Sequence, residues 1–152
     1  MQTKEGEAMV FRTRPPDFNP KFEVVSCFLE YDGKILLLHR QDYKPQGGTW
    51  GAPAGKVDAG ETTLQAIIRE LHEETSQVVR EGDKLRYFCE VYVRFPTCDF
   101  TYHIFHLPLD HEPRISIDSG EHKAFCWVSP QDALRMNLIL DEDHCIKLFY
   151  QM

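Results

Sequence analysis

The sequence predicts an α/β fold, in which one mixed β-sheet has helices covering its faces. Three observations support this class. Two hairpin-like strand pairs flank one long amphipathic helix, a further strand and two helix signals close the chain, and we find no internal repeat. At 152 residues with 42% hydrophobic and 27% charged residues, the chain suits a single domain with one core. We expect residues 1–21, which carry several prolines, to form an extended arm, and residues 22–152 to form the domain.

The first predicted elements are two strands joined by a tight turn. Residues 22–30 and 34–39 are rich in β-branched and aliphatic residues, and the turn between them contains Asp32-Gly33. Asp-Gly between apolar runs is a strong hairpin signal. A short strand over residues 50–53 then leads into a loop punctuated by glycine at residues 55–60.

The clearest helix follows this loop. Its apolar residues recur with the spacing of one buried stripe, at Leu64, Ile67, Ile68 and Leu71. Thr62, with Gln65 three positions later, is typical of a capping box. We therefore expect the helix to begin at Thr62 and to pack against the core through these four side chains.

The second half of the chain repeats the pattern of strands followed by helices. Residues 85–93 and 99–107 form a second predicted hairpin, and residues 123–128 a further strand. Ser129-Pro130 indicates a helix start, because serine caps helices and proline suits the first turn. A last helix is expected to begin at Asp141 and to run through Tyr150.

The charge balance limits the function. Seventeen basic residues against 24 acidic ones give a formal net charge of -7, which argues against binding to a nucleic-acid polymer. The start of the chain is polar and the longest aliphatic run is Ile35 to Leu38, so we expect no membrane association and a cytoplasmic protein. Five cysteines without a CxxC pair are interpreted as reduced thiols. His111, His122 and His144 are interpreted as surface residues, and His103 and His106 as pointing to opposite faces of a strand.

The predicted helix carries a cluster of carboxylates. At about 100° per residue, Glu70, Glu73 and Glu74 fall on one face, beside the apolar stripe. Two carboxylates about 4 Å apart repel by about 1 kcal/mol in water, and a bound cation would turn that repulsion into attraction. Oxygen ligands suit Mg²⁺ or Mn²⁺. Three glutamates alone are also typical of a solvated helix face, so the decision depends on their wider spacing.

That wider spacing resembles a known family signature. The segment contains Gly55, five residues, Glu61, seven residues, Arg69-Glu70-Leu71, one residue, and Glu73-Glu74. This pattern is similar to the Nudix box of the Nudix hydrolases, and the similarity extends over about residues 22 to 150. It implies the Nudix fold, an α/β/α sandwich. The chain departs from the box at Ser76 and Gln77, where glycine and an aliphatic residue are usual, so we expect the end of the helix to differ locally.

The resemblance implies roles for individual residues. Glu70, Glu73 and Glu74 would be metal ligands for Mg²⁺ (with Mn²⁺ as a substitute), together with the carbonyl of Ala54. Arg69 would pair with a box carboxylate and hold it in place. Glu121, in a later loop, resembles an acidic residue that many family members bring to the metals. Either Glu70 or Glu121 would serve as the general base.

Residues that contact the substrate are harder to predict. Arg40 would reach a phosphate, and Trp50, Phe95 or Tyr102 would stack on a base, although a place in the core is the commoner fate of such rings. By their places in and beside the box, Gly55 and Glu61 are also expected at the substrate, with pairing to Arg69 as the alternative role of Glu61. Specificity is expected in the loops at residues 42–49, 94–99 and 110–121.

The function implied by the resemblance is hydrolysis of a pyrophosphate bond. The substrate would be a nucleoside diphosphate linked to another group, such as a nucleoside triphosphate or an ADP-ribose-like compound, attacked at phosphorus by metal-activated water. One alternative is a Nudix module that senses a nucleotide without cutting it. Another is an isomerase of prenyl diphosphates, which ranks last because no cysteine has a suitable context. The resemblance leaves the oligomeric state open, with a homodimer as one alternative.

Overall fold

A computed structural model describes residues 8–152 of the chain. Residues 1–7 of the predicted arm lie outside the described residues. The strands are β1 (Met9–Phe11), β2 (Pro20–Tyr31), β3 (Lys34–Arg40), β4 (Trp50–Gly51), β5 (Ala54–Lys56), β6 (Arg86–Arg94), β7 (Asp99–Leu109) and β8 (His122–Val128). The helices are α1 (Thr63–Thr75), α2 (Pro130–Ala133) and α3 (Glu142–Tyr150).

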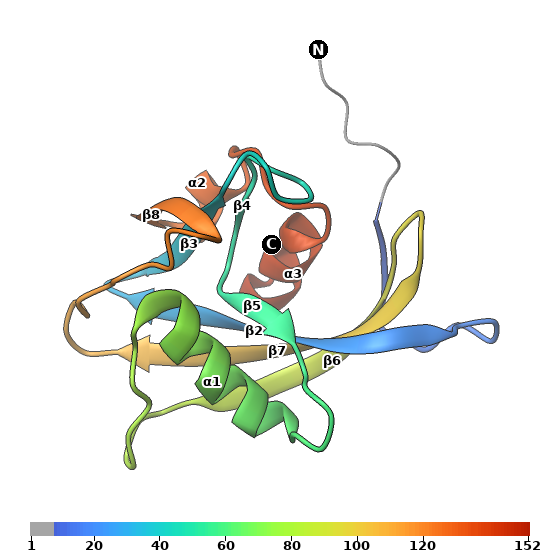
Figure 1. The fold of residues 1–152 in the computed structure, drawn as a ribbon, viewed down its shortest axis with the longest axis horizontal. Coiled ribbons are helices and arrows are strands. Elements are labelled where there is room, and N and C mark those ends of the chain that lie inside the picture. Colours follow the sequence, from blue (N-terminus) through green and yellow to red (C-terminus); the bar gives the residue numbers. More distant parts are fainter. Residues whose placement is uncertain (1–7) are drawn as a thin grey trace.

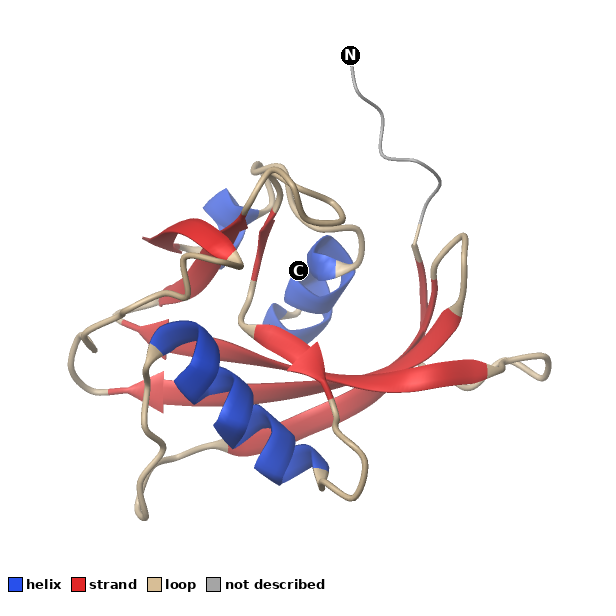
Figure 2. Cartoon of the chain, in the orientation of Figure 1, coloured by secondary structure: helices blue, strands red, loops and turns tan. Residues whose placement is uncertain are grey.

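The strands form a mixed sheet, as the sequence predicts. Within the described chain the order is β1-β6-β7-β2-β3-β4, with β5 paired to β2 and β8 paired to β3. The pairing of β2 with β7 is parallel, from Pro20 opposite Asp99 to Tyr31 opposite Leu109, and the other pairings are antiparallel. Figure 1 shows α1 on one side of the long strands, and α2 and α3 on the other. The layers are therefore helix, sheet and helix (Figure 2).

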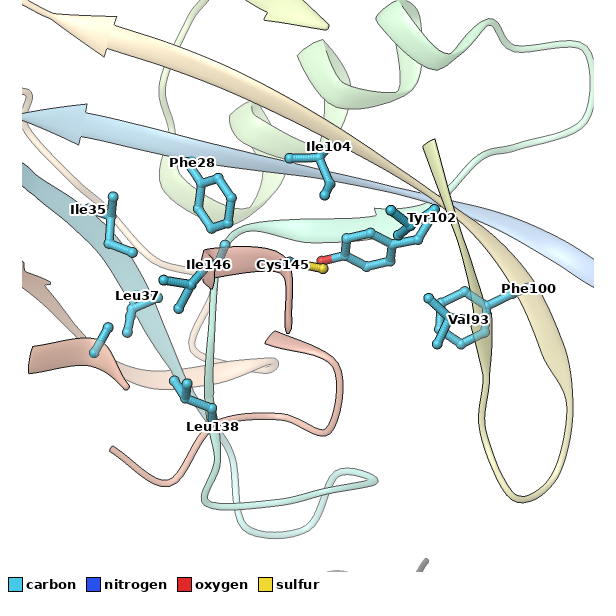
Figure 3. Packing of buried hydrophobic residues seen from close by; sticks show 13 residues of the cluster. Phe28, Ile35, Leu37, Val93, Phe100, Tyr102, Ile104, Leu138, Cys145 and Ile146 are labelled. Atoms are coloured by element: carbon cyan, nitrogen blue, oxygen red, sulfur yellow. The ribbon is translucent and has the colours of Figure 1, made fainter. Parts of the chain in front are cut away.

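The alternation of side chains along the central strand divides the core in two. Val25, Cys27 and Leu29 of β2 point toward α1 and pack with its apolar residues. Phe28 points to the opposite face, where it packs with Ile146 of α3 (Figure 3). Because successive strand residues face opposite sides of a sheet, one strand supplies both cores. The two helix layers are thereby held in place relative to β2.

The buried face of α1 differs from the predicted one. Ile67 and Leu71 are fully buried, but Leu64 is 51% exposed and Ile68 37% exposed. The side chains that turn inward beside Ile67 and Leu71 are those of Ala66, Glu70 and Thr75. The prediction of Leu64 and Ile68 as core residues is wrong, because periodicity alone cannot separate an apolar stripe from the true contact face. The helix is rotated so that part of its carboxylate face packs toward the sheet.

Most of the other predicted elements are present, with shifted boundaries. The Asp32-Gly33 turn joins β2 to β3, and the capping box of Thr62 and Gln65 is formed on both sides. The expected strand at residues 50–53 is two short strands, β4 and β5, so that Gly55 and Lys56 belong to a strand and not to the predicted loop. At the start of the chain, β1 pairs with β6, and β2 begins at Pro20.

No helix among residues 8–152 is long and apolar enough to span a membrane. All five cysteines are free, as expected, and Cys27 and Cys145 are buried.

Candidate active site

The box carboxylates lie where α1 crosses β5. A side chain at Gly55 would collide with the carboxyl group of Glu70, because a Cβ atom built there meets its carbon and both oxygens. A larger residue at this position would force the carboxyl group of Glu70 to shift, which is a physical reason for glycine at this place in the box. Glu70 itself is only 8% exposed.

Glu74, one turn further along α1, is hydrogen-bonded to the same strand, β5. Its carboxylate accepts a hydrogen bond from the backbone N–H of Ala54 at 2.8 Å. Burial and the neighbouring charge of Glu70 raise the pKa of Glu74 well above its usual range, and Glu121 adds to this effect while Arg40 opposes it. Burial also raises the pKa of Glu70, against the effect of Arg69. The site therefore concentrates negative charge that it only partly compensates.

Arg69 holds the carboxylates of the box together. Its guanidinium group donates to both oxygens of Glu61 at 2.8 and 2.9 Å, to Glu70 at 2.8 Å and to Glu73 at 3.2 Å. It also donates to the carbonyl of Lys56 at 3.0 Å. The hydrogen bond from Arg69 lowers the pKa of Glu61 to about 2. Glu61 is thus a partner of Arg69 at the start of α1, the alternative role considered for it.

Glu73 stands apart from its two neighbours. Its side chain is 55% exposed and accepts a hydrogen bond from Arg69. Within residues 8–152, no three histidine, cysteine or acidic side chains come close enough to form a preassembled metal site. Glu70, Glu73 and Glu74 offer carboxylate oxygens whose negative charge Arg69 only partly compensates, which fits a hard divalent cation. The chemistry of the three side chains therefore suits Mg²⁺ or Mn²⁺, and Glu73 is the most exposed of them.

At the end of α1, Ser76 occupies the position where the box usually has glycine. Ser76 adopts the left-handed conformation, with φ 64° and ψ 14°, and its N–H donates to the carbonyl of His72 at 3.0 Å. Its hydroxyl donates to the carbonyl of Ser116 at 3.1 Å, and the N–H of Ser116 donates to the carbonyl of Thr75. These contacts offset the cost of a left-handed serine. The turn that glycine usually makes is therefore made here by serine.

Glu121 lies in the loop before β8 and faces the same region. Its carboxylate forms an ion pair with Lys44 at 2.9 Å. The two loops are joined again where the N–H of Gln41 donates to the carbonyl of Glu121 at 3.0 Å and where the hydroxyl of Tyr43 donates to the carbonyl of Gly120. Glu121 is near enough to raise the pKa of Glu74. The structure thus brings Glu121 toward Glu74.

A cavity of about 260 Å³ opens beside the box. Its volume is close to that of small-molecule sites. Glu74 and Ala54 line it on the side of α1, and Glu142 lines it on the side of α3. The complete lining consists of Phe22, Val24, Leu38, Arg40, Thr49, Gly51, Ala52, Ala54, Lys56, Glu74, Phe95, Phe100, Tyr102, His122, Ile139, Asp141 and Glu142.

Some of the residues expected to contact the substrate line this cavity, and others lie elsewhere. Arg40, Phe95 and Tyr102 line the cavity. Trp50 is not among the lining residues, and its ring stacks on His39 with centroids 4.1 Å apart. Gly55 packs against the glutamate of α1, as described above. Tyr102 is only 4% exposed and belongs to the core, the alternative considered for such rings. Phe95 is partly buried, as is Phe22, which sequence reasoning did not single out, so a stacking role in the cavity is open to these two rings.

The prediction that His122 lies on the surface is wrong. His122 is only 6% exposed and lines the cavity. Burial, and then the charge of Arg40, lower its pKa, so that the neutral imidazole is favoured. A histidine at the start of a strand carries no sequence signal for burial, which here arises from the packing of β8 beside β3.

Two further acidic residues in the cavity were missed. Asp141 and Glu142 are 3% and 1% exposed, and both line the cavity. The sequence predicts a helix start at Asp141, and α3 does begin there, but the side chain makes no capping hydrogen bond. Glu142 instead accepts a hydrogen bond from the N–H of Ala52 at 2.6 Å. Two consecutive buried acidic residues at a helix start are read from sequence as caps, and only the tertiary structure reveals where they point.

Comparison with known proteins gives consistent matches. The model of the NUDIX domain family matches residues 20–149. The CTP pyrophosphohydrolase of Escherichia coli (strain K12) is 36% identical over 118 residues, which cover 76% of this chain and 82% of that protein. Dihydroneopterin triphosphate diphosphatase of Haemophilus influenzae is 26% identical over 145 residues, with 86% and 87% covered. The crystal structure of a MutT NUDIX hydrolase from Burkholderia pseudomallei has a TM-score of 0.69 at 25% identity, covering 83% of this chain and 95% of that one.

Proposed function

Because this chain belongs to the Nudix family, we propose that it hydrolyses the pyrophosphate bond of a nucleoside diphosphate linked to another group. One observation carries the proposal. The carboxylates of Glu70 and Glu74 converge beside β5, and Glu74 lines a cavity that is also lined by four aromatic side chains, Phe22, Phe95, Phe100 and Tyr102. Such a site combines a place for cations with a place for a nucleoside.

The roles of the residues follow from their surroundings. Glu70, Glu73 and Glu74, with the carbonyl of Ala54, would hold divalent cations, Mg²⁺ or Mn²⁺. Arg69 keeps Glu70 and Glu73 in position through its hydrogen bonds. When bound, such cations supply charge neutralisation for phosphate oxygens and activation of water.

The remaining polar groups would bind the substrate and move protons. Arg40 lines the cavity near Glu74 and offers a positive charge to a phosphate. Glu70 and Glu121 are both candidates for the general base, since each is a carboxylate beside Glu74. Phe22 and Phe95 provide apolar faces for a sugar or a base.

A nucleoside triphosphate is the first candidate substrate. The relative that is 36% identical is a CTP pyrophosphohydrolase, and the one from Haemophilus influenzae acts on dihydroneopterin triphosphate. Both names describe triphosphate substrates. An ADP-ribose-like compound is the second candidate.

A substrate panel tests this proposal. The purified chain should be incubated with Mg²⁺ or Mn²⁺ and with nucleoside triphosphates or ADP-ribose, and the products identified by mass. We expect release of a nucleoside monophosphate that stops when the metal is chelated. Nucleotides that raise the melting temperature without any product would instead indicate a sensing module.

The metal-binding role of Glu74 has its own test. Glu74→Gln should lower kcat by at least about a hundredfold, the scale of losing a major electrostatic element. Glu81→Gln, an exposed residue in the turn after α1, is the matched control and should keep full activity. A folded Glu74→Gln protein with nearly full activity would refute the assignment.

A further inference from the structure

The wall of the cavity contains a buried imidazole ring with an unsatisfied nitrogen. His122 is 6% exposed and lines the cavity. Its Nδ1 atom is buried and has no hydrogen-bond partner among the described residues. Buried polar groups in native proteins are nearly always hydrogen-bonded, so an exception in a cavity wall calls for an explanation. A ligand that enters the cavity would supply the missing partner.

A bulge in β8 separates His122 from its neighbour in the chain. The register of β8 against β3 shifts between His39 and Arg40, so that Arg40 pairs with His122 and Lys123 is the extra residue. The side chain of Lys123 forms an ion pair with Asp42 at 2.8 Å and is 34% exposed. Bulges re-aim side chains and are frequent next to active sites. Here two consecutive residues are divided between the cavity wall and the surface.

The backbone around His122 is held on both sides. Its N–H donates to the carbonyl of Asp118 at 2.9 Å, and the side chain of Asp118 accepts the N–H of Gly120 at 2.9 Å. From the other loop, the Nε2 atom of Gln41 donates to the carbonyl of Ser119 at 2.9 Å. The ring is therefore left to turn about its own side-chain bonds. A half-turn about Cβ–Cγ exchanges Nδ1 with Cδ2, so either edge of the ring can present a nitrogen to a ligand.

The charges near His122 place it at the end of the cavity that belongs to the box. The ring lies within electrostatic reach of Arg40 and Glu121. Both of these residues also act on Glu74, and Arg40 and Glu74 line the cavity together with His122. The proposed function assigns the phosphates of the substrate to this end.

A phosphate oxygen is the partner that suits the ring at this place. An imidazole carries at least one N–H donor in either protonation state, and phosphate oxygens accept. Hydrogen bonds to charged acceptors are roughly twice as strong as those between neutral groups. Arg40 already donates from its Nε atom to the carbonyl of Pro45, so part of its guanidinium group is engaged within the protein. A second donor beside Arg40 would extend the contact with the phosphates.

We propose that His122 contacts the substrate, and that its imidazole N–H donates a hydrogen bond to a phosphate oxygen beside Arg40. The ligand class is the diphosphate or triphosphate group of a nucleotide. The role assigned to His122 is to bind and orient this group, with no transfer of a proton. This inference rests on the proposed function, because that function places the phosphates at the box.

Three substitutions test the contact through the hydrolysis of CTP. His122→Leu removes both ring nitrogens, whereas His122→Asn and His122→Gln keep an N–H donor near the positions of Nδ1 and Nε2. We expect His122→Leu to lower kcat/KM by at least about tenfold and at least one amide variant to stay within about threefold of the wild type, on the scale of one hydrogen bond to a charged group. His111→Leu, at a side chain that is 74% exposed, is the matched control and should keep full activity. Full activity in His122→Leu, or equal losses in all three variants, would overturn the proposal.

Nuclear magnetic resonance tests the same contact in the unaltered protein. With ¹⁵N-labelled histidine, the ring signals of His122 are those that disappear in His122→Asn. Inorganic pyrophosphate, added at constant Mg²⁺ concentration, should shift these signals and leave those of His111 in place. Calorimetry should give a dissociation constant for pyrophosphate at least about tenfold higher in His122→Leu than in His111→Leu, for the same reason. Signals of His122 that stay unmoved at saturating pyrophosphate would overturn the proposal.

These measurements separate the inference from the proposed function. Pyrophosphate that shifts the ring signals of His122, in a chain that hydrolyses none of the nucleotides tested, would support the phosphate contact and refute the hydrolase. Hydrolysis of CTP by the wild type and by His122→Leu with equal kcat/KM, and with ring signals that pyrophosphate does not move, would do the reverse.

Discussion

At the scale of single residues, Gly55 determines how closely α1 approaches the sheet. The sequence marks it only as a position in the box, and the structure supplies the reason, which is the carboxyl group of Glu70 lying where a Cβ atom would be. Because that carboxyl group is buried and hydrogen-bonded to Arg69, it cannot move aside freely. The position of the Glu70 carboxyl group therefore depends on glycine at residue 55.

We expect Gly55→Ala to destabilise the protein by about 1–3 kcal/mol, the usual cost of overpacking, and to reduce activity because Glu70 is displaced. Thermal or urea unfolding measures the first effect and kcat the second. Gly120→Ala serves as a control for stability, since its Cβ atom would meet only the side-chain oxygen of Asp118, at 3.3 Å. Equal melting temperatures for the wild type and both variants would contradict this account of Gly55.

Residue-level predictions failed where burial depends on distant partners. His122 and Glu142 both line the cavity, yet nothing near them in sequence indicates it. Glu142 meets Ala52, which lies 90 positions away in the chain. The box carboxylates could be found from sequence because all three lie within five residues of one helix.

At the scale of elements, α1 has its apolar residues on two different sides. Ile67 and Leu71 face β2 and β7, while Leu64 and Ile68 extend into solvent. The 3.6-residue period correctly predicted a helix, and the predicted capping box is present. The rotation of the helix could not be predicted, because inward-facing Glu70 appears polar in any hydrophobicity pattern.

This rotation predicts different costs for two identical substitutions. Leu71→Ala should lower the free energy of unfolding by about 2–5 kcal/mol, because it leaves a cavity in the core. Leu64→Ala should change it by less than about 0.5 kcal/mol, as for exposed positions in general. Urea denaturation of both variants measures the difference. Similar losses at the two positions would show that α1 is rotated toward the face expected from sequence.

At the scale of the whole molecule, the sequence predicted the kinds of elements and the mixed sheet, but it did not predict which distant strands pair. Local signals were enough for the hairpins and for the mixed sheet, since turns and periodicity are short-range properties. The parallel pairing of β2 with β7 joins strands about 80 residues apart, and no local signal specifies it. The cavity depends on that pairing, because Phe22 of β2 and Phe100 and Tyr102 of β7 form its aromatic walls.

The buried carboxyl of Glu142 should make the stability of the whole molecule depend on pH. Its pKa is raised from about 4.5 to about 8 on folding, so between these values the folded state binds more protons than the unfolded state. The stability that this group contributes is therefore largely present near pH 5 and is lost as the pH rises toward 8. His122 acts in the opposite direction, because burial lowers its pKa, and a comparison of wild type with Glu142→Gln removes its contribution.

The difference between these two proteins in the free energy of unfolding should shift by on the order of 3 kcal/mol from pH 5 to pH 8, in favour of the glutamine variant. Urea denaturation at several pH values measures it. Glu61 does not interfere, because Arg69 lowers its pKa to about 2 and it is ionised throughout this range. A difference that stays constant from pH 5 to pH 8 would mean that Glu142 is ionised in the free protein and already has a donor for its second oxygen.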